Sequence, residues 1–196
     1  MKRSFNRVIN YKRGVGGRTL ELIKIFEKGK SDKISNVKLA KLKNKEAFTN
    51  LIHENLTSMY RVARGILNTE QDIEDAIQNT TLIAFNKITT LRDEKFFKTW
   101  LIRILINECN KIYKYNKRFK NEASEEAYTI DTTNNIDLYN AISRLSDELR
   151  VSTILFYFDD LTYKEISNVL GIPEGTVKSR VFRAKQGLYE MLKDEE

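Results

Sequence analysis

Residues 161–185 read LTYKEISNVLGIPEGTVKSRVFRAK, and this stretch predicts two helices joined by a tight turn. Thr162 and Glu165 have the capping-box spacing, in which two side chains satisfy the free backbone donors of a helix start. Gly171 suits the corner because a residue without Cβ takes a positive φ at little steric cost, and Pro173 suits the opening of the second helix. The stretch is therefore a candidate helix-turn-helix.

The second helix of this stretch has two different faces. Its apolar face, at the spacing of a packed helix, consists of Val177, Val181, Ala184 and Leu188. Its other face carries two cations, a hydroxyl and an aromatic ring, and these are Lys178, Ser179, Phe182 and Arg183. A recognition helix presents such a face to the major groove of DNA. A solvated basic helix that closes a small bundle has the same pattern, so both interpretations stay open.

Length and residue types exclude several classes of protein. At 196 residues the chain can form one large or two small domains, and we expect two. No apolar run is long enough for a membrane span or a signal peptide, which predicts a soluble cytoplasmic protein. The single Cys109 excludes an internal disulfide, and the single His53 without a Cys/His cluster excludes the usual zinc sites. We therefore expect no metal and no cofactor.

The positive charge is concentrated at the N-terminus. The chain has a net charge of +7, whereas residues 1–45 hold 14 Lys/Arg and 3 Asp/Glu, a balance of +11. The other 151 residues therefore sum to −4. Overall basicity thus says little about the folded domains, and local basic patches are the better guide to nucleic-acid binding. Residues 1–36 lack a sustained apolar period and are expected to form a disordered basic arm.

The N-terminal domain begins with apolar residues at helical spacing. Between Val37 and Leu67 they predict a short helix followed by a long one, with Leu56 on the inward face. The next helix, about residues 70–87, has an apolar stripe and a second, mixed stripe. The second stripe consists of Asp75, Gln78, Leu82 and Phe85. Such an outer face suggests a protein-binding surface, unless Leu82 and Phe85 pack on a neighbouring helix.

A long helix follows at about residues 96–117. Trp100, Arg103 and Asn107 recur on one side of it, where an indole, a guanidinium and an amide could bind single-stranded nucleic acid. Taken alone, Trp100 fits a core position better than a stacking platform. The same helix continues into a basic segment that includes Lys111 and Lys114, which supports contact with phosphates.

The C-terminal domain follows an acidic, polar linker at residues 121–137. Residues 138–196 then contain four predicted helices that end in the helix-turn-helix. The inward residues of the second of these helices are expected to be Leu149, Ile154, Leu155 and Phe158. The fold class is thus all-α, with two small helical domains at residues 37–120 and 138–196 joined by a flexible acidic linker.

Three motifs in this chain resemble those of the extracytoplasmic-function (ECF) sigma factors, which are two-domain bacterial transcription initiation factors. The motifs are DAIQ at residues 75–78, FKTWLIRI at 97–104 and GTVKSRVFRAK at 175–185. The resemblance covers about residues 37–192 and says nothing about the arm. It implies an alternative sigma factor that binds core RNA polymerase and promoter DNA. It also implies an anti-sigma factor, bound to the membrane, as a further partner, and we expect a monomer.

The resemblance assigns roles to the candidate residues. The helix with Asp75, Gln78, Leu82 and Phe85 would dock on the largest polymerase subunit. The loop around Leu91 and the helix with Trp100, Arg103 and Asn107 would open the minus-ten element and capture a flipped base. The family often has an aromatic residue where this chain has Leu91. The minus-35 element would be read in the major groove by Lys178, Ser179, Phe182 and Arg183, with Arg180 nearby and with Gly175 and Thr176 at its phosphates.

Two other classes of protein share part of this sequence pattern. An autonomous helix-turn-helix regulator of the LuxR type would bind DNA without polymerase, usually as a dimer at paired half-sites. Such a regulator would have no use for the Asp75/Gln78 face or for the Trp100 helix. A recombinase-like enzyme would need a serine, tyrosine or carboxylate constellation in residues 40–120, and none is evident. The sequence therefore predicts a specificity factor and not an enzyme.

Overall fold

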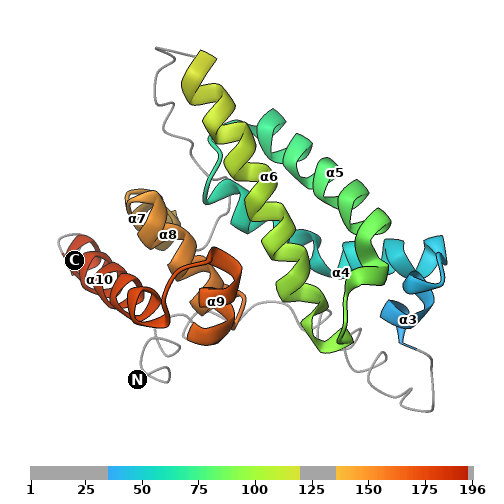
Figure 1. The fold of residues 1–196 in the computed structure, drawn as a ribbon. Helices are drawn as coiled ribbons and strands as arrows, with labels where there is room; N and C mark the ends of the chain where they lie inside the picture. The colour runs from blue at the N-terminus through green and yellow to red at the C-terminus, as the bar shows by residue number, and fades with distance from the viewer. Residues whose placement is uncertain (1–34, 120–135, 194–196) are drawn as a thin grey trace, which may run out of the picture. The chain divides into compact units, whose positions relative to one another are not determined.

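The computed structural model describes residues 35–119 and 136–193, and these residues form helices and short turns without a strand among them. They belong to one compact unit, Asn36–Glu196 (Figure 1). The all-α prediction is confirmed for this part of the chain. The predicted arm at residues 1–36 and the predicted linker at 121–137 lie almost wholly outside the described residues.

The N-terminal half consists of α3 (Asn36–Lys41), α4 (Lys45–Arg64), α5 (Glu70–Lys87) and α6 (Phe97–Phe119). Two short 3₁₀ turns, η1 (Ile88–Thr90) and η2 (Glu94–Phe96), connect α5 to α6. Asparagine and threonine side chains cap two of the helices: Asn44 accepts from the N–H of Ala47, and Thr69 accepts from that of Asp72. The short helix followed by a long one, and the bounds of the next helix, agree with the prediction.

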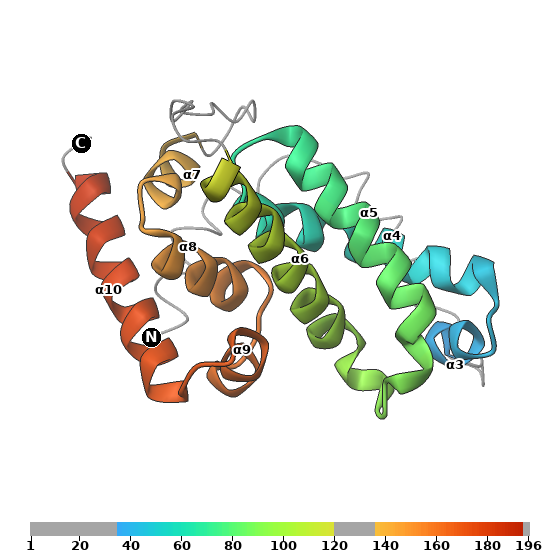
Figure 2. The same ribbon diagram turned by 45° about the horizontal axis from the view of Figure 1, so that its top comes forward.

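The core of this half lies between α4, α5 and α6. Figures 1 and 2 show α5 and α6 side by side, and α4 contacts both. The buried residues of α5 follow one another at helical spacing and form its apolar stripe: Ile73, Ala76, Thr80 and Ala84. One predicted core residue of α4 differs, since Leu56 is 41% exposed.

The C-terminal half consists of α7 (Ile136–Ser143), α8 (Asp147–Thr153), α9 (Tyr163–Leu170) and α10 (Glu174–Lys193). α8 continues directly into η3 (Ile154–Phe158), a π-helical turn. Because a π turn has more residues per turn than an α-helix, the α-helical spacing fails there. Phe156 is buried, while Phe158, which was predicted to face inward, is only half-buried.

The two halves share one hydrophobic core. Residues from α8, η3, α9 and α10 form a continuous buried cluster with residues of α4, α5 and α6. α6 contacts α9, and α4 contacts η3. Leu101, Ile102, Leu105 and Ile106 are all buried on α6. α6 is therefore buried over a wider arc than a domain standing alone would require.

Candidate nucleic-acid interface

The helix-turn-helix is built as its sequence predicts. The Thr162 hydroxyl accepts a 3.2 Å hydrogen bond from the N–H of Glu165, and the Thr162 N–H donates a 2.9 Å bond to the Glu165 carboxylate. Hydrogen bonds from the Thr162 hydroxyl and backbone hold the pKa of Glu165 below its usual value. Gly171 ends α9 in the left-handed conformation with φ 67°. Ser167 fixes the turn by donating to the carbonyl of Ile172 at 2.6 Å.

The predicted reading face of α10 points to solvent. The apolar stripe Val177, Val181, Ala184 and Leu188 is buried, which leaves the opposite side of the helix free. Lys178, Ser179, Phe182 and Arg183 are all exposed on that side, and Phe182 is 59% exposed. An exposed phenyl ring between two cations has no role in the core of the described unit. The face is thus available to DNA.

Contacts along α10 hold this face in place. Lys178 Nζ lies 2.9 Å from a carboxylate oxygen of Glu174, so the cation is shared with an acid one turn earlier. Ser179 Oγ donates to the carbonyl of Thr176 at 2.9 Å, and Arg183 Nε donates to that of Ser179 at 3.4 Å. The guanidinium NH₂ groups of Arg183 are not used by these bonds, which leaves its bidentate edge for a base or a phosphate. Gly175 is exposed, and a Cβ there would have nothing within 4 Å.

Arg180 does not belong to this face. Its guanidinium lies 2.7 Å from Glu148, its side chain is only 15% exposed, and its Nε is buried without a hydrogen-bond partner. Arg180 therefore ties α10 to α8. Arg180 was predicted to contact DNA, but in this structure position 180 falls between the apolar stripe and the reading face, and the helix packing turns it towards α8.

The second candidate face, on α6, is only partly open. Arg103 and Asn107 are exposed, whereas Trp100 is half-buried and packs against the hydrophobic core, with its ring centroid 6.0 Å from that of Phe97. The indole thus serves the core as well as offering an edge to solvent. Farther along, Lys114 is exposed and Lys111 pairs with Glu108 at 2.6 Å. The guanidinium, the amide and one edge of the indole remain accessible.

The loop before α6 exposes an aromatic residue, Phe96, at a different position from the predicted Leu91. Leu91 is 5% exposed, so its side chain belongs to the core and is not available to stack on a base. Phe96 is 44% exposed, and the ammonium of Lys95 lies 4.9 Å from the centre of its ring. The sequence contains the signal for this arrangement: Phe97 continues the inward stripe of α6 with Leu101, which leaves Phe96 outside that stripe.

Three of the four residues in the predicted protein-binding stripe of α5 are exposed. Asp75, Gln78 and Leu82 are exposed, and the Leu82 side chain is 64% exposed. Phe85 is half-buried: its ring packs edge-on against Phe48 at 5.1 Å between centroids. For Phe85 the alternative, packing on a neighbouring helix, is correct. The open part of the face is therefore an acid, an amide and a leucine.

A shallow groove adjoins this face, and the sequence pattern did not predict it. It has a volume of about 530 Å³ and runs between α4 and α5. Its lining combines an apolar floor with acids and an amide: Leu56, Thr57, Tyr60, Glu70, Glu74, Ile77 and Gln78. The exposed Leu56 belongs to it. The groove extends the α5 face into one continuous mixed surface.

Two absences can be stated for residues 35–119 and 136–193. They contain no group of three or more His, Cys, Asp or Glu residues that could hold a metal ion. Among the same residues no helix combines the length and the apolar character that crossing a bilayer requires.

Comparison with known families gives two matches in one chain. The profile of Sigma-70 region 2 matches residues 51–119, and that of Sigma-70 region 4 matches residues 136–188. The first match covers α5 and α6, and the second covers the helix-turn-helix. The two candidate faces thus lie in two regions that one family carries in this order.

Curated proteins give the same assignment. The ECF RNA polymerase sigma-E factor of Haemophilus influenzae is 30% identical over 135 residues, which is 59% of this chain and 71% of the relative. The ECF RNA polymerase sigma factor SigW of Bacillus subtilis is 27% identical over 178 residues, 81% of this chain and 95% of the relative. Among solved structures, the sigma factor RpoE from Bartonella quintana, in complex with the anti-sigma factor NepR, superposes with a TM-score of 0.65 at 25% identity. That superposition covers 76% of this chain and 98% of the other.

Proposed function

The chain belongs to the ECF sigma factors, and from this premise we propose that it binds core RNA polymerase and directs it to promoters that carry two recognition elements. The factor is an alternative sigma factor, and its role is specificity and not catalysis. It acts in the cytoplasm, where the polymerase is.

The exposed face of α10 is the observation that carries the proposal. Lys178, Ser179, Phe182 and Arg183 stand free of the core on a helix of a matched region 4. We assign this face to the minus-35 element, with base edges read in the major groove. Gly175 and Thr176, at the start of α10, would lie at phosphates, since helix N-termini and small residues suit anions.

The face on α6 is assigned to the minus-ten element. Arg103 and Asn107 are exposed, and the half-buried Trp100 offers an edge beside them. Phe96 replaces the buried Leu91 in this assignment, because its exposed ring can stack on an unpaired base. Lys111 and Lys114 would hold the backbone of the DNA that follows. Opening of the duplex is thus supported by one stacking ring and by a row of polar groups on one helix.

The α5 face and its groove are assigned to the polymerase. Asp75, Gln78 and Leu82 give a mixed polar and apolar surface of the kind that protein partners bind. An anti-sigma factor is a further partner, because the Bartonella relative is in complex with one. The family resemblance further implies that this anti-sigma factor is anchored in the membrane.

Run-off transcription tests this function. The full chain is mixed with core polymerase and a pool of DNA fragments from the source genome, and the transcripts are sequenced. We expect discrete start sites that share two upstream motifs. Transcripts no different from those of core polymerase alone would contradict the proposal. Tight, sequence-specific DNA binding without polymerase would instead favour the autonomous regulator.

A further inference from the structure

A carboxylate stands beside the reading face of α10. Glu174 is the first residue of α10, about one helical turn before Lys178. Its carboxylate lies 2.9 Å from Lys178 Nζ, and the side chains of Lys178 and Glu174 are 57% and 45% exposed. The N-terminal residues of a recognition helix are those that contact base edges. An acid therefore lies where the reading face would meet DNA, although the sequence pattern pointed only to its cations, its hydroxyl and its aromatic ring.

Lys178 is held next to this acid from two sides. Its ammonium lies 5.8 Å from the ring centre of Tyr163, the first residue of α9. An aromatic ring attracts a cation that lies over its face, so α9 and the start of α10 both restrain the lysine. Glu174 and Lys178 thus present a hydrogen-bond acceptor and a donor side by side.

The packing of α10 keeps this pair at the surface. Val177 and Val181 anchor the buried side of the helix. Arg180 lies 2.7 Å from Glu148 of α8, and this contact restrains the rotation of α10 about its axis. Next to the pair, a Cβ built on Gly175 would have nothing within 4 Å. The pair is therefore held in one orientation on an open surface.

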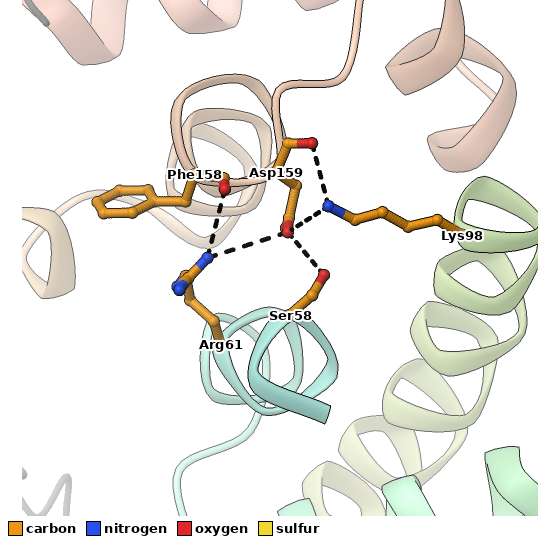
Figure 3. Close-up of polar contacts among 5 residues, drawn as sticks. All are labelled: Ser58, Arg61, Lys98, Phe158 and Asp159. Atoms are coloured by element: carbon orange, nitrogen blue, oxygen red, sulfur yellow. Dashed lines mark hydrogen bonds and ion pairs between the residues drawn. The ribbon is translucent and has the colours of Figure 1, made fainter. Parts of the chain in front are cut away.

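Other acids of the C-terminal half have a role within the fold. Asp159 has a side chain that is 1% exposed, and its Oδ1 accepts a 2.6 Å hydrogen bond from Ser58 Oγ and lies 3.0 Å from Lys98 Nζ (Figure 3). Glu165 caps the start of α9. Glu174 differs from both, because it is exposed and its ion-pair partner is a cation of the reading face. The fold thus accounts for Asp159 and Glu165 and leaves the position of Glu174 to be explained.

A carboxylate close to DNA discriminates between bases. It accepts hydrogen bonds but donates none, and phosphates repel it. In the major groove cytosine and adenine present an amino group, whereas guanine and thymine present a carbonyl oxygen in the corresponding place. A carboxylate therefore matches cytosine or adenine and disfavours guanine and thymine.

The ammonium beside Glu174 completes this match. A lysine has three N–H donors, so Lys178 can bond Glu174 and still donate to a base. The acceptors next to the amino group are adenine N7, or O6 of the guanine that pairs with cytosine. A lysine without the acid would bind phosphates and any base acceptor alike. The acid thus restricts the lysine to base pairs that place an amino group opposite Glu174.

We propose that Glu174 is a specificity-determining residue of the minus-35 contact, and that it selects a base with an amino group, cytosine or adenine, at one position of one strand. This role of Glu174 rests on the proposed function, in which the reading face of α10 contacts promoter DNA. Arg183 lies nine residues further along α10, which is about 13.5 Å along the helix axis. Glu174 and Arg183 therefore contact different base pairs.

A carboxylate at this position also has a purely structural effect. Negative charge is favourable near the N-terminus of a helix, and oppositely charged residues four apart stabilise an exposed helix slightly. Both effects are the same on every DNA sequence. A change of base preference therefore separates the proposed role of Glu174 from support of the helix.

Transcription from a promoter library with a randomised minus-35 element tests the role of Glu174. The full chain is combined with core polymerase, and the transcripts are sequenced. At one strand position, cytosine or adenine should be used about tenfold better than guanine or thymine, the size expected for one good base contact. The library also distinguishes cytosine from adenine. A library without any such position would overturn the proposal.

Glu174→Gln is the decisive variant, because an amide can both donate and accept. It should reduce the preference to about twofold or less by improving the use of guanine and thymine, and it should leave the preferences at other positions unchanged. Glu190→Gln is the matched control, since it removes an exposed carboxylate near the far end of α10. If Glu174→Gln left every preference unaltered, or changed transcription equally on every sequence, the proposal would be overturned.

Lys178→Met shows whether the carboxylate contacts the base itself. Combined with Lys178→Met, Glu174→Gln should still relax the preference. If it no longer did, Glu174 would act only through Lys178, and the direct contact would be excluded. A wild-type chain that directs no initiation would instead contradict the proposed function, and DNA selected from the same library by the full chain alone would then test the base preference.

Discussion

Arg183 is the residue on α10 whose removal should alter promoter choice most clearly. Its side chain is exposed and its only described hydrogen bond uses Nε. Arg183→Ala should weaken use of the promoter by about 1–3 kcal/mol, and only for one base pair of the minus-35 element. Transcription from a library with that element randomised measures the effect.

Lys193→Ala is the control for Arg183→Ala, since it removes an exposed cation at the far end of the same helix. It should leave promoter preference unchanged. If Arg183→Ala weakened every sequence equally, Arg183 would contact phosphate and would not read a base.

Leu91 and Phe96 should respond oppositely to truncation. Leu91→Ala removes a buried side chain and should lower the free energy of unfolding by about 2–5 kcal/mol. Phe96→Ala should leave stability nearly unchanged but weaken binding to single-stranded minus-ten DNA by about 1–3 kcal/mol, the usual contribution of one stacked base. Denaturant unfolding and binding to a fork-junction DNA measure the two effects.

A restored activity in Phe96→Tyr would support stacking, because the ring is retained. Phe96→Ala that opens promoters as well as the wild type would remove Phe96 from the proposed interface. Leu91→Ala with unchanged stability would contradict the burial that excludes it.

Single residues differed in how well the sequence predicted them. Lys178 and Arg183 were predicted correctly as exposed because they lie opposite a clear apolar stripe. Arg180 and Phe85 lie at the edges of stripes, where a neighbouring helix decides their environment. Asp159 is buried although it is charged. Its burial depends on cations from distant parts of the chain, which no local pattern contains.

The start of α9 is the element whose stability is easiest to test. Thr162→Ala removes the hydroxyl that accepts from Glu165 and should lower the free energy of unfolding by about 0.5–2 kcal/mol at neutral pH. Thermal or denaturant unfolding measures it. Unchanged stability would mean that the capping box adds nothing beyond the packing of Ile166 and Val169.

The same capping box should make the free energy of unfolding depend on pH. The pKa of Glu165 is lowered from 4.5 by hydrogen bonds from Thr162. Its contribution is therefore full above pH 4.5 and is lost as the pH falls through the lower, folded-state pKa. Glu165→Gln, which retains the capping geometry, should lose less stability than wild type between pH 5 and pH 3. Glu190→Gln, at an exposed position on α10, should behave as wild type.

The α5 face should matter for polymerase and not for folding. Leu82→Ala shortens a side chain that is 64% exposed, so stability should change little, while affinity for core polymerase should fall by about 1–2 kcal/mol as for an apolar interface anchor. Leu42→Ala is a matched control because Leu42 is also exposed, at 78%. Titration with core polymerase compares them. Equal affinity of the two variants would place the interface elsewhere.

The sequence predicted the positions of helices correctly wherever the apolar residues keep one helical period. The bounds of α5 and the apolar stripe of α10 could be predicted because each helix has one core face. The π turn η3 could not, since five residues are too few to reveal a change of period. As a result the prediction placed Phe158 inside and left out Phe156, which is buried. More of the α6 surface is buried than one core face requires, because Ile102 and Ile106 are buried beside a second set of helices.

At the scale of the whole molecule, the sequence pointed to two domains but could not predict how they pack. Each apolar stripe identifies an inward side without identifying the partner. The shared core therefore depends on residues such as Ile154 and Gly65, whose contact joins positions far apart in the sequence. The two-domain division remains a prediction about the chain, whereas the contacts describe one compact unit, Asn36–Glu196.

Promoter spacing is the property that belongs to the whole molecule. If α10 and α6 read two elements on one duplex while the polymerase fixes both halves, the distance between the elements must be kept. Inserting about five base pairs, half a helical turn, rotates one element to the opposite side of the DNA and moves it by roughly 17 Å. Transcription should then fall strongly although both elements are intact. Inserting a single base pair should cost far less, and run-off transcription on a spacing series measures both.

Equal transcription at every spacing would mean that the two faces act independently. A sharp optimum would instead mean that the polymerase holds the two faces at one fixed distance, so that both elements must lie at matching positions on the DNA.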